Sequence, residues 1–197
     1  GSGCVLCEGV VVLYGCQIGD RVRIGPNSVV GYDGYGYYFR DGIHHKVPHA
    51  GNVVIEDDVE LGACVCVDRA KFASTVIGRG AKLDNLVQIA HNVQVGPGCI
   101  VVAQVGVAGS TKLGPYVMIG GGAGLKDNIT VGQGAQIGAH SAVHRSLEAG
   151  EIVVGTPVRP AKQFWRELRC LEELPEVLKN YRRLQKQIES LTGQAES

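Results

Sequence analysis

His91 and Gly109 are the pair of residues in this sequence best suited to chemistry. His91 stands in the stretch IAHNV, and Gly109 stands in the stretch VAGST. A neutral imidazole can take a proton from an attacking amine or hydroxyl, and a free backbone amide can stabilise a developing oxyanion. The two groups can act together only if the fold places positions i and i+18 side by side.

An aliphatic residue at every sixth position indicates such a fold. The run has twelve consecutive members: Ile77, Leu83, Ile89, Val95, Val101, Val107, Leu113, Ile119, Leu125, Val131, Ile137 and Val143. Amphipathic helices repeat at 3.6 residues and half-buried strands at 2, so a strict period of six indicates a short strand and a turn, repeated. The sequence therefore predicts an all-β solenoid, a parallel β-helix in which three hexapeptides make one coil.

Two shorter blocks keep the same period upstream of this run. They are Ile18, Ile24 and Val30, and then Ile55, Leu61 and Val67, after which a slip of four positions precedes Ile77. The blocks predict a β-helix over residues 4–155 with about six coils. Neighbouring coils lie about 4.8 Å apart, so His91 is expected at an outward-facing corner with Gly109 directly above it.

Two segments depart from the period. Residues 31–54 hold four of the seven tyrosines and three histidines, which predicts an inserted loop that either builds a binding site or packs on the solenoid. Residues 156–197 are expected to form a helical segment, in which Pro175 should start a new helix or kink one and so give two helical pieces. The apolar residues of this segment recur at intervals of three or four positions and are expected to mediate self-association. They are Leu168, Leu171, Leu174, Leu178, Tyr181, Leu184, Ile188 and Leu191.

Composition excludes several classes of protein. The 19 basic and 19 acidic side chains balance, whereas a nucleic-acid-binding protein would show a basic excess. No apolar run approaches the roughly 18 residues of a membrane helix, so no integral membrane segment is expected. Seven scattered cysteines favour a reducing cytosol over a disulfide framework, and we expect a cytoplasmic protein.

A metal site is not expected. The candidate zinc ligands are Cys4, Cys7 and Cys16, the pair Cys64 and Cys66, and the loop histidines His44, His45 and His49. None of these sets has a second pair at a convincing spacing. A zinc-dependent carbonic anhydrase on the same kind of prism would need three histidines between subunits, but His91 stands alone on its face, far from His140 and His144.

The residues around His91 also resemble one known family. DNLVQIAHNV at 84–93, AGS at 108–110, GYGY at 34–37 and VDR at 67–69 are similar to the UDP-3-O-(3-hydroxyacyl)glucosamine N-acyltransferases of bacterial lipid A biosynthesis, over about residues 11–190. The resemblance implies a homotrimeric left-handed β-helix with active sites between subunits. It also implies transfer of a 3-hydroxyacyl chain from acyl carrier protein to the 2-amine of a UDP-3-O-acyl-glucosamine.

The same resemblance implies roles for individual residues. His91 would be the general base and the Gly109 amide the oxyanion donor, and the only prosthetic group would be the 4'-phosphopantetheine of the carrier protein. Asn92, Ser110 and Asn128 form a column at intervals of one coil and are expected, with Tyr35 and Tyr37 of the inserted loop, to contact substrate. The alternative for the column is a row of solvent-facing turn residues.

This sequence departs from the family pattern at three places. Family members carry a uridine-binding domain before the β-helix, and we expect it to be lacking here, either because it was removed or because the protein naturally lacks it and its acceptor differs. Ala70 and Lys71 follow the VDR stretch where the family usually has glycine. Asn128 stands near the position of a second histidine in some members, so a mechanism with two histidines does not transfer.

A basic cluster opens the helical segment. Arg159, Lys162, Arg166 and Arg169 are expected to receive the acidic acyl carrier protein, with an ordinary solvated helix as the alternative. Two other functions stay open at this point. One is a hexapeptide-repeat acyltransferase that uses coenzyme A or a carrier-bound acyl group on a different acceptor. The other is a catalytically inactive trimeric β-helix that only binds.

Overall fold

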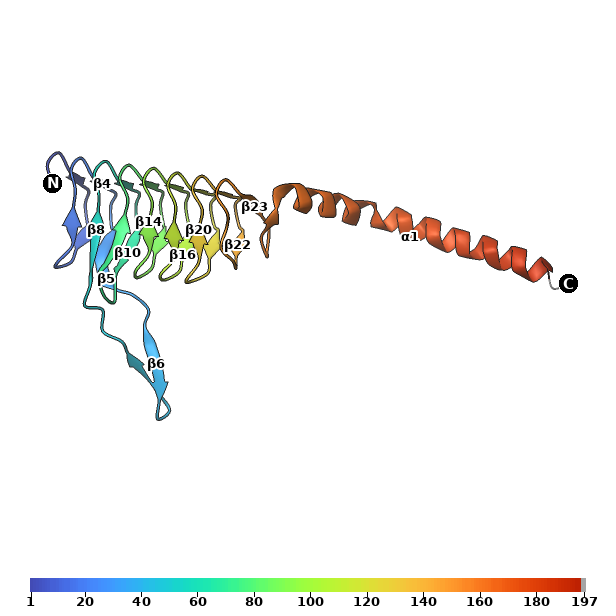
Figure 1. Cartoon of the computed structure of the whole chain (residues 1–197), viewed down its shortest axis with the longest axis horizontal. Helices are drawn as coiled ribbons and strands as arrows, with labels where there is room; N and C mark the ends of the chain where they lie inside the picture. Colours follow the sequence, from blue (N-terminus) through green and yellow to red (C-terminus); the bar gives the residue numbers. More distant parts are fainter. Residues whose placement is uncertain (196–197) are drawn as a thin grey trace. The chain divides into compact units, whose positions relative to one another are not determined.

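The chain forms two compact units. The computed structural model describes residues 1–195, with residues 190–195 described by their backbone alone. The first unit spans Gly1–Arg159 and the second begins at Pro160 (Figure 1). The first unit is a solenoid of short strands, and the second is a helix.

Three parallel sheets make the walls of the solenoid. The nine-stranded sheet contains, in order, β1 (Val5–Leu6), β4 (Arg23–Ile24), β9 (Glu60–Leu61), β12 (Lys82–Leu83), β15 (Ile100–Val101), β18 (Met118–Ile119), β21 (Gln136–Ile137), β23 (Ile152–Val154) and β24 (Arg159–Pro160). The seven-stranded sheet contains β2 (Val11–Val12), β5 (Val29–Asp33), β10 (Cys66–Arg69), β13 (Gln88–Ile89), β16 (Gly106–Val107), β19 (Gly124–Leu125) and β22 (Ala142–Val143). The six-stranded sheet contains β20 (Thr130–Val131), β17 (Lys112–Leu113), β14 (Gln94–Val95), β11 (Ser74–Ile77), β8 (Asn52–Ile55) and β3 (Gln17–Ile18).

The strand register confirms the parallel β-helix. Lys82 pairs with Ile100, Ile100 pairs with Met118, and Met118 pairs with Gln136, so each partner lies three hexapeptides further along the chain. All twelve members of the six-residue run are buried in the interior, none more than 4% exposed. Burying each aliphatic side chain contributes about 1.5–3 kcal/mol, so the repeated residue is also the main source of stability.

The solenoid has more coils than the six expected from the sequence. The nine-stranded sheet gains β1 at one end and β23 and β24 at the other. Leu6 and Val12 keep the six-residue period ahead of Ile18, but the run there is short, and both side chains are at least 37% exposed. At the other end Gln136 pairs with Ile152, an offset that is shorter than a full coil and therefore falls outside the period.

The two interruptions of the period appear as changes in register. Cys66 pairs with Gln88, an offset longer than one regular coil, because residues 70–73 are extra to that coil. The offset between Val29 and Cys66 is longer still, because the inserted segment lies between them. Both interruptions leave the interior row of aliphatic side chains intact, with Val30, Val67 and Ile89 all buried.

The inserted segment is not a simple loop. Its ends lie in β5 and β8, and its middle forms the antiparallel hairpin β6 (Tyr37–Arg40) and β7 (Ile43–Lys46), which projects from the solenoid (Figure 1). Asp41 and Gly42 connect the two strands with φ angles of 52° and 77°. An Asp-Gly pair adopts these left-handed conformations readily and is typical of a tight hairpin turn. That turn signal lay in the sequence and was missed.

The second unit is one helix, α1 (Ala161–Ala195), with Pro175 inside it. The expectation that a second helix starts at Pro175 is therefore wrong. Proline removes one backbone hydrogen bond, to the carbonyl of Leu171, and that residue is 63% exposed, so water can satisfy the carbonyl. The apolar residues from Leu168 to Ile188 are exposed along the helix, whereas the side chain of Leu191 lies outside the described residues. In residues 1–195 no helix is apolar enough over a sufficient length to cross a membrane.

Because the coils stack closely, replacing one glycine by alanine should destabilise the fold, whereas replacing another should not. A Cβ on Gly96 would lie 2.6 Å from the carbonyl carbon of Gly114, whereas a Cβ on Gly106 would meet nothing within 4 Å. Gly96→Ala is expected to lower the free energy of unfolding by about 2 kcal/mol because a coil must shift, and Gly106→Ala to leave it unchanged or slightly raised. Chemical unfolding of both variants measures this, and equal losses would contradict the stacking.

Candidate active site

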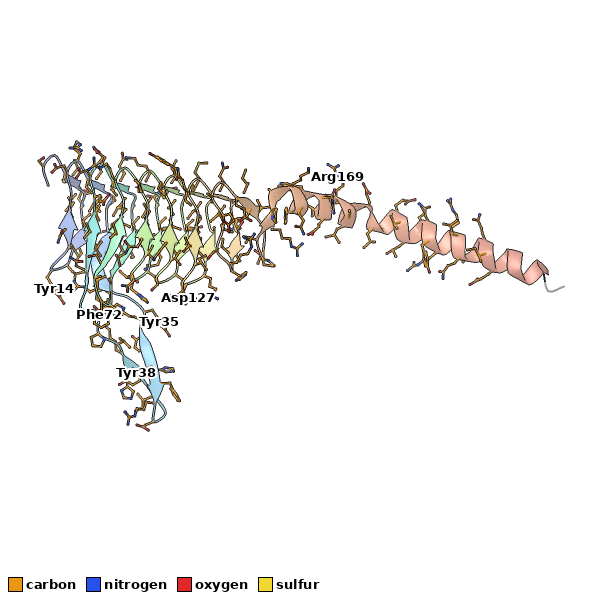
Figure 2. The ribbon with its side chains drawn as sticks, viewed as in Figure 1. Tyr14, Tyr35, Tyr38, Phe72, Asp127 and Arg169 are labelled. Carbon is orange, nitrogen blue, oxygen red and sulfur yellow. The ribbon has the colours of Figure 1, made fainter. Side chains whose placement is uncertain are left out.

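A pocket of about 550 Å³ lies at the corner that follows β13, β16 and β19. Its lining residues are Tyr35, Lys71, Ala90, His91, Ala108, Gly109, Ser110, Asp127 and Asn128. Most of them come from three successive coils, while Tyr35 comes from the inserted segment and Lys71 from the extra stretch at 70–73. Tyr35 and Asp127 lie at the edge of the solenoid from which the hairpin projects (Figure 2). The pocket therefore forms where the regular corner meets both interruptions of the repeat.

Stacked turns bring His91 and Gly109 together. The Ser110 amide donates to the His91 carbonyl at 3.0 Å, and the Asn128 amide donates to the Gly109 carbonyl at 3.0 Å. A Cβ on Gly109 would lie 2.6 Å from Cε1 and 2.8 Å from Nε2 of His91. The imidazole thus packs against the bare Cα of Gly109, a contact that only glycine permits.

The backbone amide of Gly109 is available to a ligand. Within residues 1–195 this amide has no hydrogen-bond acceptor, although the amides of its neighbours Ala108 and Ser110 donate to Leu125 and His91. An unpaired amide beside an imidazole is the arrangement that a developing oxyanion requires.

Asn92 determines which nitrogen of His91 carries the proton. The Oδ1 of Asn92 accepts from the Lys71 amide at 3.0 Å, and its Nδ2 donates to the Phe72 carbonyl at 2.8 Å. These two contacts orient the amide, because an N–H can only donate and a carbonyl can only accept. Nδ1 of His91 lies 3.1 Å from the same Oδ1, so Nδ1 must be the protonated nitrogen and Nε2 keeps a free lone pair.

The column of polar residues divides into two kinds. Asn92, Ser110 and Asn128 all occupy left-handed corner positions, with φ angles of 62°, 63° and 57°. Ser110 and Asn128 line the pocket, as a substrate contact would require. Asn92 does not, because its side chain is engaged with residues 71, 72 and 91. Asn92 therefore contacts the His91 ring rather than the pocket, and it is placed to orient that ring.

Two glycines let the inserted segment pack closely, Gly34 against His91 and Gly36 against His49. A Cβ on Gly34 would lie 3.0 Å from Cβ of His91, and a Cβ on Gly36 would lie 3.0 Å from Cε1 of His49. Tyr35, between them, lines the pocket and is 82% exposed. Tyr37 lies outside the pocket lining, with its ring centroid 5.1 Å from that of Tyr35. The segment thus contributes one aromatic side chain to the pocket and supports it with a second.

His49 is a buried neighbour of His91 that sequence reasoning considered only as a metal ligand. It is 4% exposed, and its ring lies edge-on to that of His91 with the centroids 5.3 Å apart. Burial lowers the pKa of His49, and the Val47 carbonyl 3.0 Å from Nδ1 opposes that shift. Nε2 is buried and has no hydrogen-bond partner among the described residues. Nothing in the six-residue period could have indicated this contact, because it depends on the path of the inserted segment.

Arg69 holds the base of the inserted segment, next to Asp68 in β10. Arg69 is 2% exposed and donates to the carbonyls of Gly31 at 2.6 Å and Tyr14 at 2.9 Å. Its guanidinium also lies 4.0 Å from the centre of the Tyr14 ring. Burial raises the pKa of Asp68 to about 6, with a small further rise from Asp33 and an opposing hydrogen bond from Gln88.

The other candidate residues are not among those that line the pocket. Lys162, Arg166 and Arg169 lie on α1, while Arg159 ends the first unit in β24. A second basic set on α1, which the sequence analysis missed, consists of Lys179, Arg182, Arg183 and Lys186. In the described part of the chain, no three His, Cys, Asp or Glu side chains come close enough to hold a metal ion.

Comparisons with known proteins agree with the repeat and with the residues around His91. The family model described as bacterial transferase hexapeptide (six repeats) matches residues 1–32 and 74–109. A curated UDP-3-O-acylglucosamine N-acyltransferase from Anaeromyxobacter dehalogenans strain 2CP-1 is 50% identical over 99% of this chain and 57% of its own length. A protein of the same name from Methylorubrum populi is 42% identical over 89% of this chain and 48% of its own length. The chain therefore spans about half the length of these relatives, and the resemblance found in the sequence is confirmed.

Solved structures support the fold. A UDP-N-acetylglucosamine acyltransferase from Bacteroides fragilis 9343 superposes with a TM-score of 0.73 at 22% identity, covering 81% of this chain and 60% of that one. The Arabidopsis UDP-N-acetylglucosamine acyltransferase gives a TM-score of 0.69 at 19% identity, covering 81% of this chain and 62% of that one. At such identities the likeness extends to the β-solenoid alone.

The contact between Gly109 and His91 predicts that two substitutions compensate in stability. Gly109→Ala should lower the free energy of unfolding by about 1–3 kcal/mol because the methyl group displaces the imidazole. The loss should shrink to less than half in a His91→Ala background, where the methyl group has room. A double-mutant cycle by chemical unfolding measures the coupling, and additive effects would contradict the packing described here.

The raised pKa of Asp68 predicts a pH-dependent effect of Asp68→Asn. Because the folded pKa of about 6 exceeds the ordinary value of 3.8, the native state loses stability as pH rises from 3.8 through 6 and the carboxylate ionises. The variant avoids that loss, so its melting temperature relative to the parent chain should increase between pH 4 and pH 8. A difference that stays constant or falls over this range would contradict the assignment.

Proposed function

The chain belongs to the family of the UDP-3-O-acylglucosamine N-acyltransferases, which it matches over nearly all of its length, and we propose that it carries the acyl-transfer site of such an enzyme. The reaction is transfer of a 3-hydroxyacyl chain from acyl carrier protein to the 2-amine of a UDP-3-O-acyl-glucosamine, a step of lipid A biosynthesis. The observation that carries the proposal is the His91 imidazole packed against Gly109, whose amide is unpaired among the described residues.

The geometry supports a direct transfer with one general base. Nε2 of His91 takes a proton from the acceptor amine as its nitrogen attacks the thioester carbonyl carbon. The carbonyl oxygen becomes an oxyanion and accepts a hydrogen bond from the Gly109 amide. When the tetrahedral intermediate collapses, the C–S bond breaks and the phosphopantetheine sulfur leaves with the proton held by His91. The amide product and the free thiol balance the reaction without a resident cofactor or metal.

Neighbouring residues receive supporting roles in this proposal. Asn92 holds His91 with Nε2 unprotonated, and Ser110, Asn128 and Tyr35 contact the substrates from the pocket wall. Tyr37 supports Tyr35 from β6. The basic residues Arg159, Lys162, Arg166 and Arg169 offer charge complementary to an acidic carrier protein.

The proposal extends to the assembly and its place in the cell. The pocket opens on the side of a single solenoid, so a second wall must come from elsewhere, and we assign it to a neighbouring copy in a homotrimer. We place the enzyme in the bacterial cytoplasm, a reducing compartment in which its seven cysteines stay free.

The proposed base predicts the outcome of one substitution. His91→Ala should reduce turnover at least 100-fold, because removal of a positioned general base costs about that factor or more. The assay uses purified chain, 3-hydroxyacyl carrier protein and UDP-3-O-acyl-glucosamine, with mass spectrometry of the N-acylated product. His140→Ala is the matched control, since His140 also packs over a glycine, Gly122, at a corner outside the pocket. Similar turnover in the parent chain and the His91 variant would contradict the assigned base.

A further inference from the structure

Lys71 is a cation in the pocket to which the acyl-transfer mechanism gives no task. Its side chain is half-buried, and a Cβ on Gly36 would lie 3.0 Å from its Cε and 3.5 Å from its Nζ. Among the described residues no carboxylate lies within 4 Å of Nζ, whereas Lys46 and Lys82 are paired with Asp33 and Glu60. A half-buried ammonium without a counter-charge is poised to bind an anion.

Hydrogen bonds hold the backbone of Lys71 in place relative to His91. Its backbone amide donates to Oδ1 of Asn92 at 3.0 Å, the same oxygen that faces Nδ1 of His91. Its carbonyl accepts from the Ala50 amide at 3.0 Å. The backbone of Lys71 is thus tied both to the residue that positions the imidazole and to the end of the inserted segment.

The charges of the pocket are separated along the solenoid axis. Residues 70–73 precede β11, which belongs to the coil before that of β14 and His91, as the pairing of Val76 with Gln94 shows. Asp127 lies two full coils after His91, or roughly 10 Å at the spacing of parallel strands. The lysine end of the pocket is therefore positive and the aspartate end negative, with His91 and Gly109 between them.

We propose that Lys71 binds a phosphate group of a substrate held in this pocket. The inference rests on the proposed function, in which both substrates carry phosphate: the diphosphate of the nucleotide sugar and the phosphodiester of the phosphopantetheine arm. A lysine ammonium at the end of a flexible stem is well suited to a phosphate oxygen, because it acts as a point charge that needs no fixed approach angle. Asp127 repels the same anion from the opposite end, so the charge pair orients the substrate across His91.

Steady-state kinetics with each substrate varied in turn tests this assignment. Lys71→Met removes the charge and keeps the stem against Gly36, so the KM of the substrate held by Lys71 should rise about 10-fold while kcat changes less than 2-fold. The KM of the Lys71→Arg variant should lie between those of the parent chain and the Lys71→Met variant. Lys112→Met is the control, because Lys112 lies on β17 outside the pocket lining.

The substrate whose KM rises identifies the source of the phosphate. A rise for UDP-3-O-acyl-glucosamine assigns Lys71 to the nucleotide diphosphate, and a rise for the acyl carrier protein assigns it to the phosphopantetheine phosphodiester. Both KM values within 2-fold of the parent chain would overturn the proposal.

A binding measurement separates this inference from the proposed reaction. UDP and 4'-phosphopantetheine are titrated calorimetrically into the purified parent chain and the Lys71→Met variant, with no acyl transfer involved. Weaker binding of one probe by the variant supports the phosphate site even where the parent chain shows no turnover, in which case only the proposed reaction fails. Equal affinity in both proteins, or no binding of either probe by the parent chain, overturns the phosphate site.

Discussion

The stacking of one coil on the next is the constraint on which every other feature of this protein depends. Corner amides donate to carbonyls in the preceding coil, as Ser110 does to His91 and Asn128 to Gly109. Since the coils are one strand spacing apart, two residues separated by three hexapeptides in the sequence come into van der Waals contact in the structure. A histidine and a glycine at that separation are therefore assembled into one site by the same hydrogen bonds that hold the solenoid together.

The sequence predicted this structure correctly in the parts of the chain where the six-residue period is unbroken. Where an aliphatic residue recurs at every sixth position, as from Ile77 to Val143, the sequence predicts the buried residues and the strand register. It also predicts the contact of His91 with Gly109. Where the period breaks, it could not indicate the path of the chain, and there the hairpin, the contact of His49 with His91 and the position of Lys71 in the pocket were missed. The prediction at Pro175 failed for another reason. In a solvent-exposed helix, water can satisfy the carbonyl that loses its backbone partner at a proline, so the helix continues.

The interruptions are also what turn a regular scaffold into a site. A corner histidine on an uninterrupted solenoid would face solvent on all outward sides, but here the segment around Gly34 and Gly36 covers one side of His91 and brings in Tyr35. Residues 70–73 supply Lys71 and the backbone groups that orient Asn92. Buried Arg69 ties the inserted segment to the solenoid, so these groups are held by hydrogen bonds before any substrate binds.

The protonation of His91 in the resting protein is the most direct test of this site. Nitrogen-15 spectra of the selectively labelled imidazole, recorded at pH 8 for the parent chain and for Asn92→Ala, distinguish a protonated ring nitrogen from one with a free lone pair. In the parent chain Nδ1 should be protonated and Nε2 free, and the Asn92 variant should show a mixture of both tautomers. A parent chain with Nε2 protonated, or one already showing both tautomers equally, would contradict the role of His91 as a base directed into the pocket.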